Sequence, residues 1–278
     1  MPSMKRVPAM NSVPSIHQVT DALERIAPLR LAADWDAVGL LVGTHREGIS
    51  RVMTCLSLTP EVAREATREG AHLVVTHHPI PFRPVSRITD GSGVGRVLLE
   101  LLGAGVAVWS GHTAWDSAAG GINDQLATAI GLEDRVPIQP DALNPLVGFG
   151  RVGMAQAGWT VAHLSQHIAK HLGVEGVHVA GDPHQKAGRV GIVCGSGGEL
   201  GASLQKAGCN TLVTGEIKLH GAIEAQANGL AVVAVGHHAS EHFSMAVLAH
   251  RLAEALPALH CWASRDEVDP LQWLMRSP

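Results

Sequence analysis

The stretch Val74-Val75-Thr76-His77-His78-Pro79 determines the fold class of this chain, because a short apolar run leads directly into two histidines and stops at a proline. Three further stretches share this design: Gly111-His112-Thr113-Ala114-Trp115-Asp116, Thr214-Gly215-Glu216 and Val235-Gly236-His237-His238-Ala239-Ser240-Glu241. Short apolar runs are typical of buried strands, and open α/β sheets bind their ligands at the carboxyl ends of the strands. The four stretches therefore predict an α/β fold with a functional site at its strand ends.

Strand and helix patterns alternate along the chain, as expected for α/β architecture. In the first half we expect helices at residues 16–27, 60–69, 94–102 and 121–130, and strands at residues 51–57, 72–76 and 106–110. Ser15, followed three residues later by Gln18, predicts a capping box at the start of the first helix.

A group of prolines at residues 137, 140 and 145 marks a boundary between two halves. We therefore divide the chain into a disordered N-terminal extension (residues 1–14), a first α/β half (residues 15–138) and a second α/β half (residues 139–278).

The second half repeats the pattern of the first. Arg51-Val52 and Arg189-Val190 each open a strand, and a glycine follows each arginine 19 residues later. At the same offset His77-His78 falls opposite Gly215-Glu216. This agreement fits either a duplication or two ordinary strand–helix–strand units. Two similar halves, each a mixed sheet flanked by helices, would place their ligand-bearing strand ends around one shared cleft.

Composition excludes several classes of protein. The net charge of −4 argues against a general nucleic-acid-binding protein. No apolar run is long enough to span a membrane, and residues 1–14 lack the apolar stretch of a secretory signal. Four scattered cysteines predict reduced thiols in the cytoplasm. Hydrophobic residues make up 46% and charged residues 17%, which favours burial of surface against other subunits.

Histidines and carboxylates recur together at the predicted strand ends. His112 and Asp116 lie four residues apart, as do His237 and Glu241, and a helical turn places such pairs on one face. The pair His77-His78 alone would suggest one core and one solvated histidine. Three groupings at three strand ends instead favour a metal site. Nitrogen mixed with carboxylate oxygen suits zinc, manganese or iron, and a carboxylate can bridge two ions.

Two features next to these motifs have open interpretations. The loop Gly195-Ser196-Gly197-Gly198 could cradle an anion with its amide groups, or it could form a bare tight turn, since it lacks the lysine of a P-loop. Lys218 and His220 could contact a substrate or simply begin a solvated helix. Tyrosine is absent, so an acid or base must be His, Asp, Glu, Lys or bound water.

Taken in order, the motifs resemble the dinuclear-metal family of GTP cyclohydrolase 1 type 2 homologues, also called Nif-three-like proteins. The resemblance begins at Trp35-Asp36-Ala37-Val38-Gly39-Leu40-Leu41-Val42-Gly43 and continues through the four stretches quoted above. It covers residues 16–261, nearly the whole chain. Ala37 replaces the usual asparagine of the family, and Glu216 replaces the usual aspartate.

The resemblance implies a site with two divalent metal ions, bridged by a glutamate, and the residues that would bind them are His77, His78, Asp116, His237 and Glu241. His112 would lie behind these ligands and orient Asp116 or a bound water. The family also implies a homohexameric ring that encloses the sites. The stretch between the halves is too short for the inserted domain that some members carry.

The function implied by the resemblance is hydrolysis of carbon–nitrogen bonds in GTP or a related purine, with opening of the imidazole ring and release of formate. His112 or Glu216 could carry protons, and Ser196, Gly197 and Lys218 are the candidate substrate contacts. The metal site alone fits a phosphoesterase or amide hydrolase equally well. A non-catalytic metal-binding scaffold or regulator is the alternative from another class.

Overall fold

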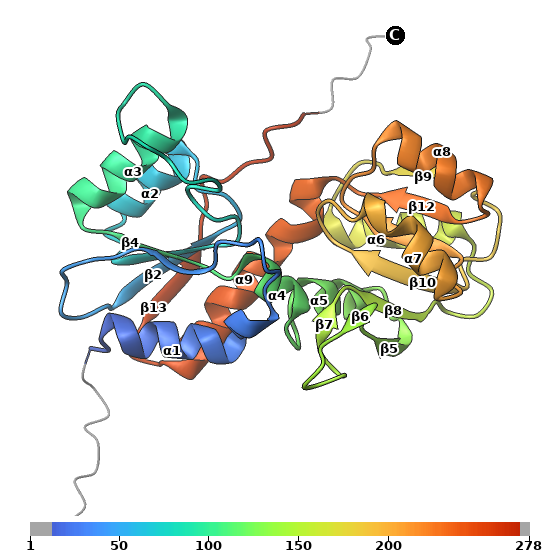
Figure 1. The fold of residues 1–278 in the computed structure, drawn as a ribbon, viewed down its shortest axis with the longest axis horizontal. Coiled ribbons are helices and arrows are strands. Elements are labelled where there is room, and N and C mark those ends of the chain that lie inside the picture. Colours follow the sequence, from blue (N-terminus) through green and yellow to red (C-terminus); the bar gives the residue numbers. More distant parts are fainter. Residues whose placement is uncertain (1–12, 273–278) are drawn as a thin grey trace, which may run out of the picture.

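The computed structural model describes residues 13–272. The predicted N-terminal extension lies outside the described residues except for Val13 and Pro14. The described chain forms two lobes, each built around a β-sheet, and they are joined by central helices (Figure 1).

The first lobe contains a five-stranded sheet in the order β1-β4-β3-β2-β13. Its strands are β1 (Gly39–Val42), β2 (Arg51–Cys55), β3 (Leu73–Thr76), β4 (Ala107–Ser110) and β13 (His260–Ala263). The strands from β4 to β13 are parallel, and β1 pairs with β4 in the antiparallel direction.

Helices cover both faces of this sheet. Helices α2 (Pro60–Arg68) and α3 (Gly93–Ala104) pack on the outer face, whereas α1 (Ile16–Ile26) and α9 (His237–Ala255) pack on the face toward the molecular centre. The alternation follows from the strand period of two residues: Val74 points to the outer cluster and Val75 to the central one.

The second lobe contains a six-stranded sheet in the order β5-β8-β10-β11-β12-β9. Its strands are β5 (Glu133–Val136), β8 (Arg151–Met154), β9 (His178–Ala180), β10 (Arg189–Val193), β11 (Thr211–Thr214) and β12 (Ala231–Ala234). Helices α5 (Ile122–Ala129) and α6 (Val161–Leu172) cover the central face. Helices α7 (Gly201–Lys206) and α8 (Leu219–Ala227) cover the outer face.

The remaining elements are short. They are the helix α4 (His112–Ser117), the 3-10 helices η1 (Leu29–Leu31) and η2 (Gly198–Leu200), and the small hairpin of β6 (Gln139–Pro140) and β7 (Gly148–Phe149). Among residues 13–272, no helix is both long and apolar enough to cross a bilayer. The described chain has four free cysteines, three of them buried.

Each sheet contains a central unit of three parallel strands, and the two units have the same arrangement. This confirms the predicted α/β fold with two similar halves. The order β4-β3-β2 in one sheet corresponds to β12-β11-β10 in the other. The register also agrees, because Thr54 pairs with Val75 and Ile192 pairs with Val213, at the same offset along the chain. The capping box of Ser15 and Gln18 on α1 is confirmed as well.

Two strands do not belong to the sheet that the predicted division at residue 138 would give them. The strand β5 precedes residue 138 but pairs with β8 of the second sheet, and β13 follows it but pairs with β2 of the first. Helix α9 provides the crossover that brings β13 back, because parallel strands need a long connection. The division of the chain into two domains at this point stays a prediction.

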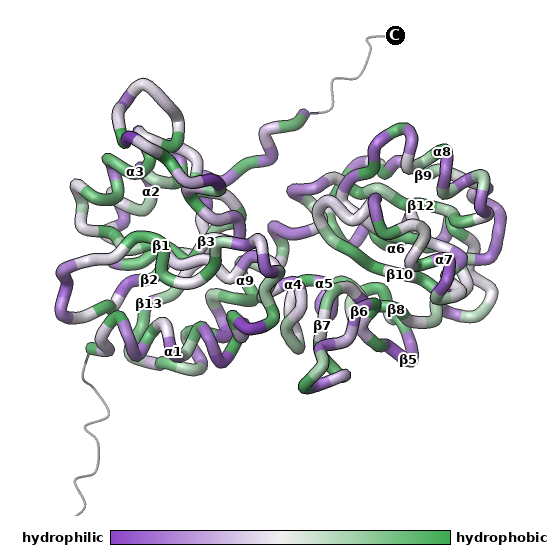
Figure 2. The backbone as a smooth tube through the Cα atoms, viewed as in Figure 1, coloured by the Kyte–Doolittle hydropathy of each residue, from purple (hydrophilic) through white to green (hydrophobic). Residues whose placement is uncertain are grey.

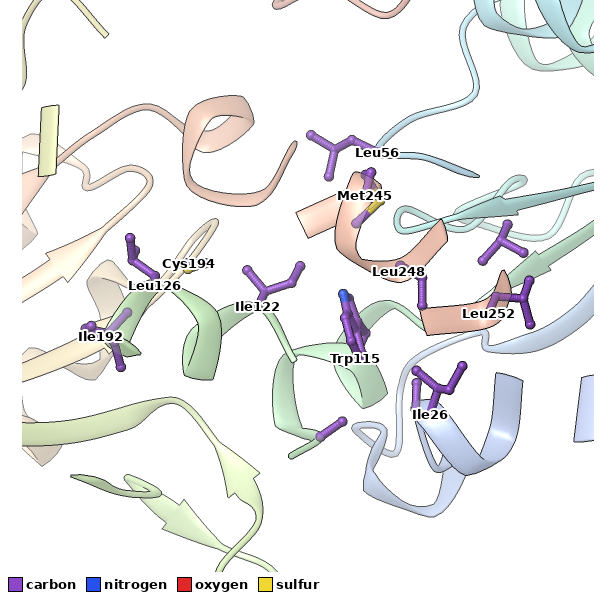
Figure 3. Close-up of a cluster of buried hydrophobic side chains, with 14 of the residues drawn as sticks. Ile26, Leu56, Trp115, Ile122, Leu126, Ile192, Cys194, Met245, Leu248 and Leu252 are labelled. Atoms are coloured by element: carbon purple, nitrogen blue, oxygen red, sulfur yellow. The ribbon is translucent and has the colours of Figure 1, made fainter. Parts of the chain in front are cut away.

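A single apolar core extends through both lobes along α9. Met245, Leu248 and Leu252 of this helix pack with side chains of the first lobe such as Ile26. The same cluster includes Trp115 and continues through helix α5 to strands of the second sheet (Figure 3). Polar residues lie mainly on the outer helices and loops, and apolar residues follow the strands (Figure 2). The core therefore fixes how the strand ends of the two lobes face each other.

Candidate metal centre

Residues from both lobes meet where their strands end. His77 and His78 follow β3, and His112 begins α4 directly after β4. From the second lobe, Glu216 follows β11, and His237 begins α9 after β12. The carboxyl ends of parallel strands thus supply the site, as the sequence predicts.

Glu241 lies at the centre of this group. Its Oε2 lies 3.2 Å from His78 Nε2 and 3.2 Å from His237 Nε2, and its Oε1 lies 3.8 Å from His77 Nε2. Asp116 Oδ1 lies 3.8 Å from the same nitrogen of His77. The predicted four-residue spacing on α9 therefore places His237 and Glu241 on one helical face, beside histidines of the other lobe.

Two overlapping groups have the geometry of metal sites. Ligand atoms of His77, His78 and His112 all lie within 4.8 Å of one another, and so do those of His78, His237 and Glu241. His78 belongs to both groups. The described residues therefore contain two overlapping sets of donors, each of which could hold a metal ion, with His78 common to both.

Hydrogen bonds to the far nitrogen orient three of the rings. His78 Nδ1 lies 2.7 Å from Ser57 Oγ, His112 Nδ1 lies 2.8 Å from Asp36 Oδ1, and His237 Nδ1 lies 3.3 Å from Glu216 Oε1. Since each Nδ1 is occupied in this way, the Nε2 atoms are directed into the cluster. Asp36 is itself held by the backbone amide and hydroxyl of Thr113.

Several buried polar atoms here have no hydrogen-bond partner within the described chain. They include both ring nitrogens of His77 and the Oδ1 atom of Asp116. A buried polar group without a partner costs free energy, so such atoms need an explanation. Neutral imidazole nitrogens beside carboxylate oxygens are the ligands that zinc and related divalent ions use. The donor set therefore fits a cation.

The electrostatics of the cluster also favour a bound cation. Burial lowers the pKa of His77 to about 3, so its ring is neutral at pH 7. Burial, followed by the repulsion from Glu241, raises the pKa of Asp116 well above its usual value. A hydrogen bond with Glu241 raises the pKa of His237 to about 9. Two buried carboxylates facing each other are destabilising unless positive charge lies between them.

A glycine allows the second lobe to approach so closely. Gly195 adopts a φ of +66°, and a Cβ at this position would collide with Oε1 of Glu241. Its amide donates a hydrogen bond of 2.9 Å to Ser240 Oγ on α9. The turn after β10 is thereby fastened against the start of α9, next to the candidate ligands.

The remaining predicted residues have mixed positions. The Ser196 hydroxyl donates a hydrogen bond to Glu216 Oε1, so Ser196 borders the site. The Gly197 amide already donates to Thr214 Oγ1 at 3.0 Å, as in a tight turn. Lys218 Nζ lies 3.7 Å from Glu199, and its side chain is 90% exposed, outside the cluster. Their roles in substrate binding stay predictions.

His112 was expected to lie behind the ligands and to orient Asp116 or a bound water, and this role stays a prediction. His112 pairs with Asp36, and it shares a candidate metal group with His77 and His78. No role was predicted for Asp36 or Ser57 from the sequence. Asp36 stands inside the quoted stretch Trp35–Gly43, which is the one local signal that could have pointed to it.

Two cavities lie beside the cluster, on either side of Glu216 and Ile217. The first, about 1020 Å³, is lined by His78, His237 and apolar residues from both lobes. The second, about 1260 Å³, has a more polar lining that includes Phe82, Arg83, Ser196, Lys218 and His220. Either cavity is large enough for a nucleotide-sized ligand.

Known proteins resemble the chain along nearly its whole length. It is 30% identical over 260 residues to the "GTP cyclohydrolase 1 type 2 homolog" of Clostridium perfringens, covering 93% of this chain and 99% of that protein. It is 32% identical over 257 residues to "NIF3-like protein 1" of Drosophila melanogaster, covering 90% of this chain and 86% of that protein.

Solved structures share the fold. The crystal structure of a Bacillus cereus protein related to NIF3 superimposes with a TM-score of 0.88 at 21% identity, covering 95% of this chain and all of the other. The family model Duf34/NIF3 (NGG1p interacting factor 3) matches residues 14–270. The chain therefore belongs to the Duf34/NIF3 family.

Proposed function

We propose that this protein is a dinuclear metal-dependent hydrolase that acts on a carbon–nitrogen bond of GTP or a related purine. The observation that carries the proposal is the pair of overlapping ligand groups that share His78 and flank Glu241. The substrate comes from the curated relatives, several of which are called GTP cyclohydrolase 1 type 2 homologues.

The residues that would hold two divalent ions are those expected from the sequence: His77, His78, Asp116, His237 and Glu241. Zinc, manganese or iron suits this donor set. When bound, such ions supply the charge that activates water near neutral pH. His112, with its Nδ1 occupied by Asp36, directs Nε2 toward the same space and is a further candidate ligand or proton carrier.

Glu216 is the best-placed proton carrier. Its side chain is 57% exposed, borders both cavities and contacts His237. The hydrogen bond from Ser196 lowers the pKa of Glu216, so its carboxylate is ionised and can accept a proton at pH 7. In the proposed reaction, water adds to the imidazole carbon of the purine, the ring opens, and a second hydrolysis releases formate.

The test is a substrate panel with two separate readouts. Metal-loaded protein is incubated with GTP, other purine nucleotides and pyrimidine nucleotides, and formate and phosphate are measured independently. We expect formate from a purine nucleotide, and none after the metal is stripped. Phosphate without formate would identify a phosphoesterase instead. Neither product from any nucleotide, in protein that retains two ions, would favour the metal-binding scaffold.

We also propose that the protein acts as a homo-oligomer in the cytoplasm. The expected form is the homohexamer that the family resemblance implies. Large exposed apolar side chains support association, among them Leu143, Leu146 and Leu271, each about 80% exposed. The free cysteines fit a reducing compartment. Light scattering would give the mass of the assembly, and a monomer at micromolar concentration would contradict this part of the proposal.

A further inference from the structure

Two exposed aromatic rings lie at the edge of the candidate metal centre. The side chains of Trp35 and Phe82 are 68% and 55% exposed, and their ring centroids lie 6.5 Å apart. Other large aromatic side chains, such as Trp109 and Trp115, are buried in the core. We call Trp35 and Phe82 the aromatic platform.

The platform adjoins the metal centre through His112. The His112 ring centroid lies 6.0 Å from that of Trp35 and 6.1 Å from that of Phe82. It also lies 5.1 Å from the ring of His77 and 5.6 Å from that of His78. A ligand on the platform is therefore one side chain away from the candidate ligands.

The rings of the platform are not stacked on each other or on His112. The planes of Trp35 and Phe82 are inclined by 56°, and each lies at 76° or more to the plane of His112. None of the three rings therefore stacks face to face on another. An aromatic face left to water forgoes the offset-stacked contact that such rings favour.

Both platform residues are held by buried or hydrogen-bonded neighbours. Next to Trp35, the Asp36 carboxylate binds His112 and the amide of Thr113, and the amide of Ala33 donates to Thr113 Oγ1 at 2.9 Å. Phe82 comes two residues after Ile80, which is buried and itself comes two residues after His78. The Trp35 side of the platform is therefore anchored, through Asp36 and Thr113, to the segment that carries His112.

Cationic and polar groups lie beyond the platform. Phe82 lines the larger cavity together with Arg83, Lys218 and His220, and with the carboxylates of Glu199, Glu216 and Glu224. Lys218 lies 3.7 Å from Glu199, whereas Arg83 has no hydrogen-bond or ion-pair partner among residues 13–272. A ligand with a flat ring and an anionic tail would match this order of groups. Purine nucleotides have this build, because a base stacks on aromatic side chains whatever its hydrogen-bonding edge.

We propose that Trp35 and Phe82 bind the planar heteroaromatic ring of the substrate beside His112, with the anionic end of the substrate toward Arg83. The inference rests on the proposed function for the choice of a purine. It goes further by naming the residues that select a flat ring, which are not metal ligands. No existing contact with His77 or Glu241 is needed for this role.

The test measures binding and turnover in zinc-loaded, full-length protein. The probes are guanosine, which has the base without phosphate, and ribose 5-phosphate, which has the phosphate without the base. The variants are Trp35→Ala, Phe82→Ala and the conservative Trp35→Phe. Leu99→Ala, which truncates a 45% exposed apolar side chain on the outer helix α3, is the matched control.

We expect guanosine affinity to fall by roughly 5- to 100-fold in both alanine variants. Trp35→Phe should keep most of it, and Leu99→Ala should leave it unchanged. Ribose 5-phosphate should bind all four variants like the wild type. Unchanged guanosine affinity in Trp35→Ala and Phe82→Ala, or no guanosine binding by the wild type, would overturn the inference.

Further results distinguish this inference from the proposed hydrolase function and from the proposed homo-oligomer. Formate release from GTP with an unaltered KM in Trp35→Ala would overturn the platform and leave the hydrolase standing. Guanosine binding that depends on the platform, without formate release from any purine, would support the platform and overturn the hydrolase. Light scattering completes the set: a lower assembly mass in Trp35→Ala, with guanosine affinity retained, would show that the rings cover a second copy of the chain.

Discussion

Glu241 concentrates the electrostatics of the candidate centre in one side chain. It is 5% exposed and within 4 Å of three histidines that arrive from two lobes. Contacts with His237 and His78 outweigh burial and keep the pKa of Glu241 below its ordinary value. A permanent negative charge in this position attracts cations and cannot be replaced by an amide of the same shape.

Glu241→Gln is therefore expected to lower the affinity for divalent ions by more than about 100-fold. Loss of a residue that only supports a metal ligand lowers the affinity by up to about 100-fold, and loss of a ligand should cost more. Elemental analysis after gel filtration would show fewer than two ions per chain. Glu254→Gln, on an exposed turn of the same helix, is the matched control and should keep the metal content. Equal metal content in both variants would contradict the role given to Glu241.

Asp36 gives a second prediction for a single residue. Asp36→Asn keeps the shape but removes the charge that holds His112 Nδ1 at 2.8 Å. We expect zinc affinity to fall by roughly 10- to 100-fold, because support behind a metal ligand has effects of this size. Calorimetric titration with zinc measures it, and the circular dichroism spectrum should stay unchanged. Wild-type affinity in this variant would remove Asp36 from the site.

The residues of the site were predictable only in part. His77, His78 and His237 stand out because each comes shortly after an apolar run, and Glu241 because it lies four residues after His237. Both signals are local in sequence. Asp36 acts on His112 from 76 residues away. No local pattern reveals a pairing over such a distance, since it depends on how the loop before β1 folds back over α4.

Among the helices and strands, too, only those with a local sequence pattern could be predicted. The units β2–α2–β3 and β10–α7–β11 were visible because buried parallel strands are continuous apolar runs. The edge strands β5 and β13 were not visible. All four residues of β5 are exposed, and β13 has one buried residue, so neither carries an apolar run. Their places depend on partners in distant parts of the chain.

A partly buried ion pair joins α5 to β8 and yields a prediction about pH. Arg151 is 2% exposed, and its Nε lies 2.6 Å from Asp124 Oδ1. Burial would raise the pKa of Asp124, but the hydrogen bond from Arg151 outweighs it and the pKa lies below 3.8. The stabilisation is therefore present above pH 3.8 and is lost as the pH falls through the folded-state value.

Asp124→Asn should lower the free energy of unfolding at pH 7 by about 2–4 kcal/mol, because the guanidinium stays buried without its counter-charge. Urea denaturation at several pH values measures the difference, which should shrink as the pH falls below 4. Asp21→Asn, on the exposed face of α1, serves as the control. A difference that stays constant down to pH 3 would argue against the ion pair as the cause.

At the scale of the whole molecule, one apolar cluster runs through both lobes, and each sheet has a further cluster on its outer face. Helix α9 contributes Leu248 and Leu252 to a cluster that reaches both sheets. The same helix carries His237 and Glu241 in its first turns. Stability and the geometry of the site therefore depend on one element, and the two lobes are expected to unfold together.

Leu248→Ala tests this coupling. The side chain is 2% exposed, so its truncation should cost about 2–5 kcal/mol and lower the melting temperature of a single transition. The neighbouring Val247 is 37% exposed, and Val247→Ala should change the melting temperature little. Calorimetry that separates into two transitions, with only one of them shifted, would show that the lobes have independent cores.

The return of the chain to its first sheet has a consequence for biosynthesis. A ribosome releases β2 early, but the neighbour of β2 on one side is β13, which ends at residue 263. Until that residue has emerged, the nascent first lobe lacks an edge strand, and before α9 is made it also lacks one of the two helices that cover its inner face. Domains that fold during synthesis usually do so from the amino end. This protein is instead expected to complete its first sheet only with β13, so the candidate metal ligands come together only after translation of the second lobe.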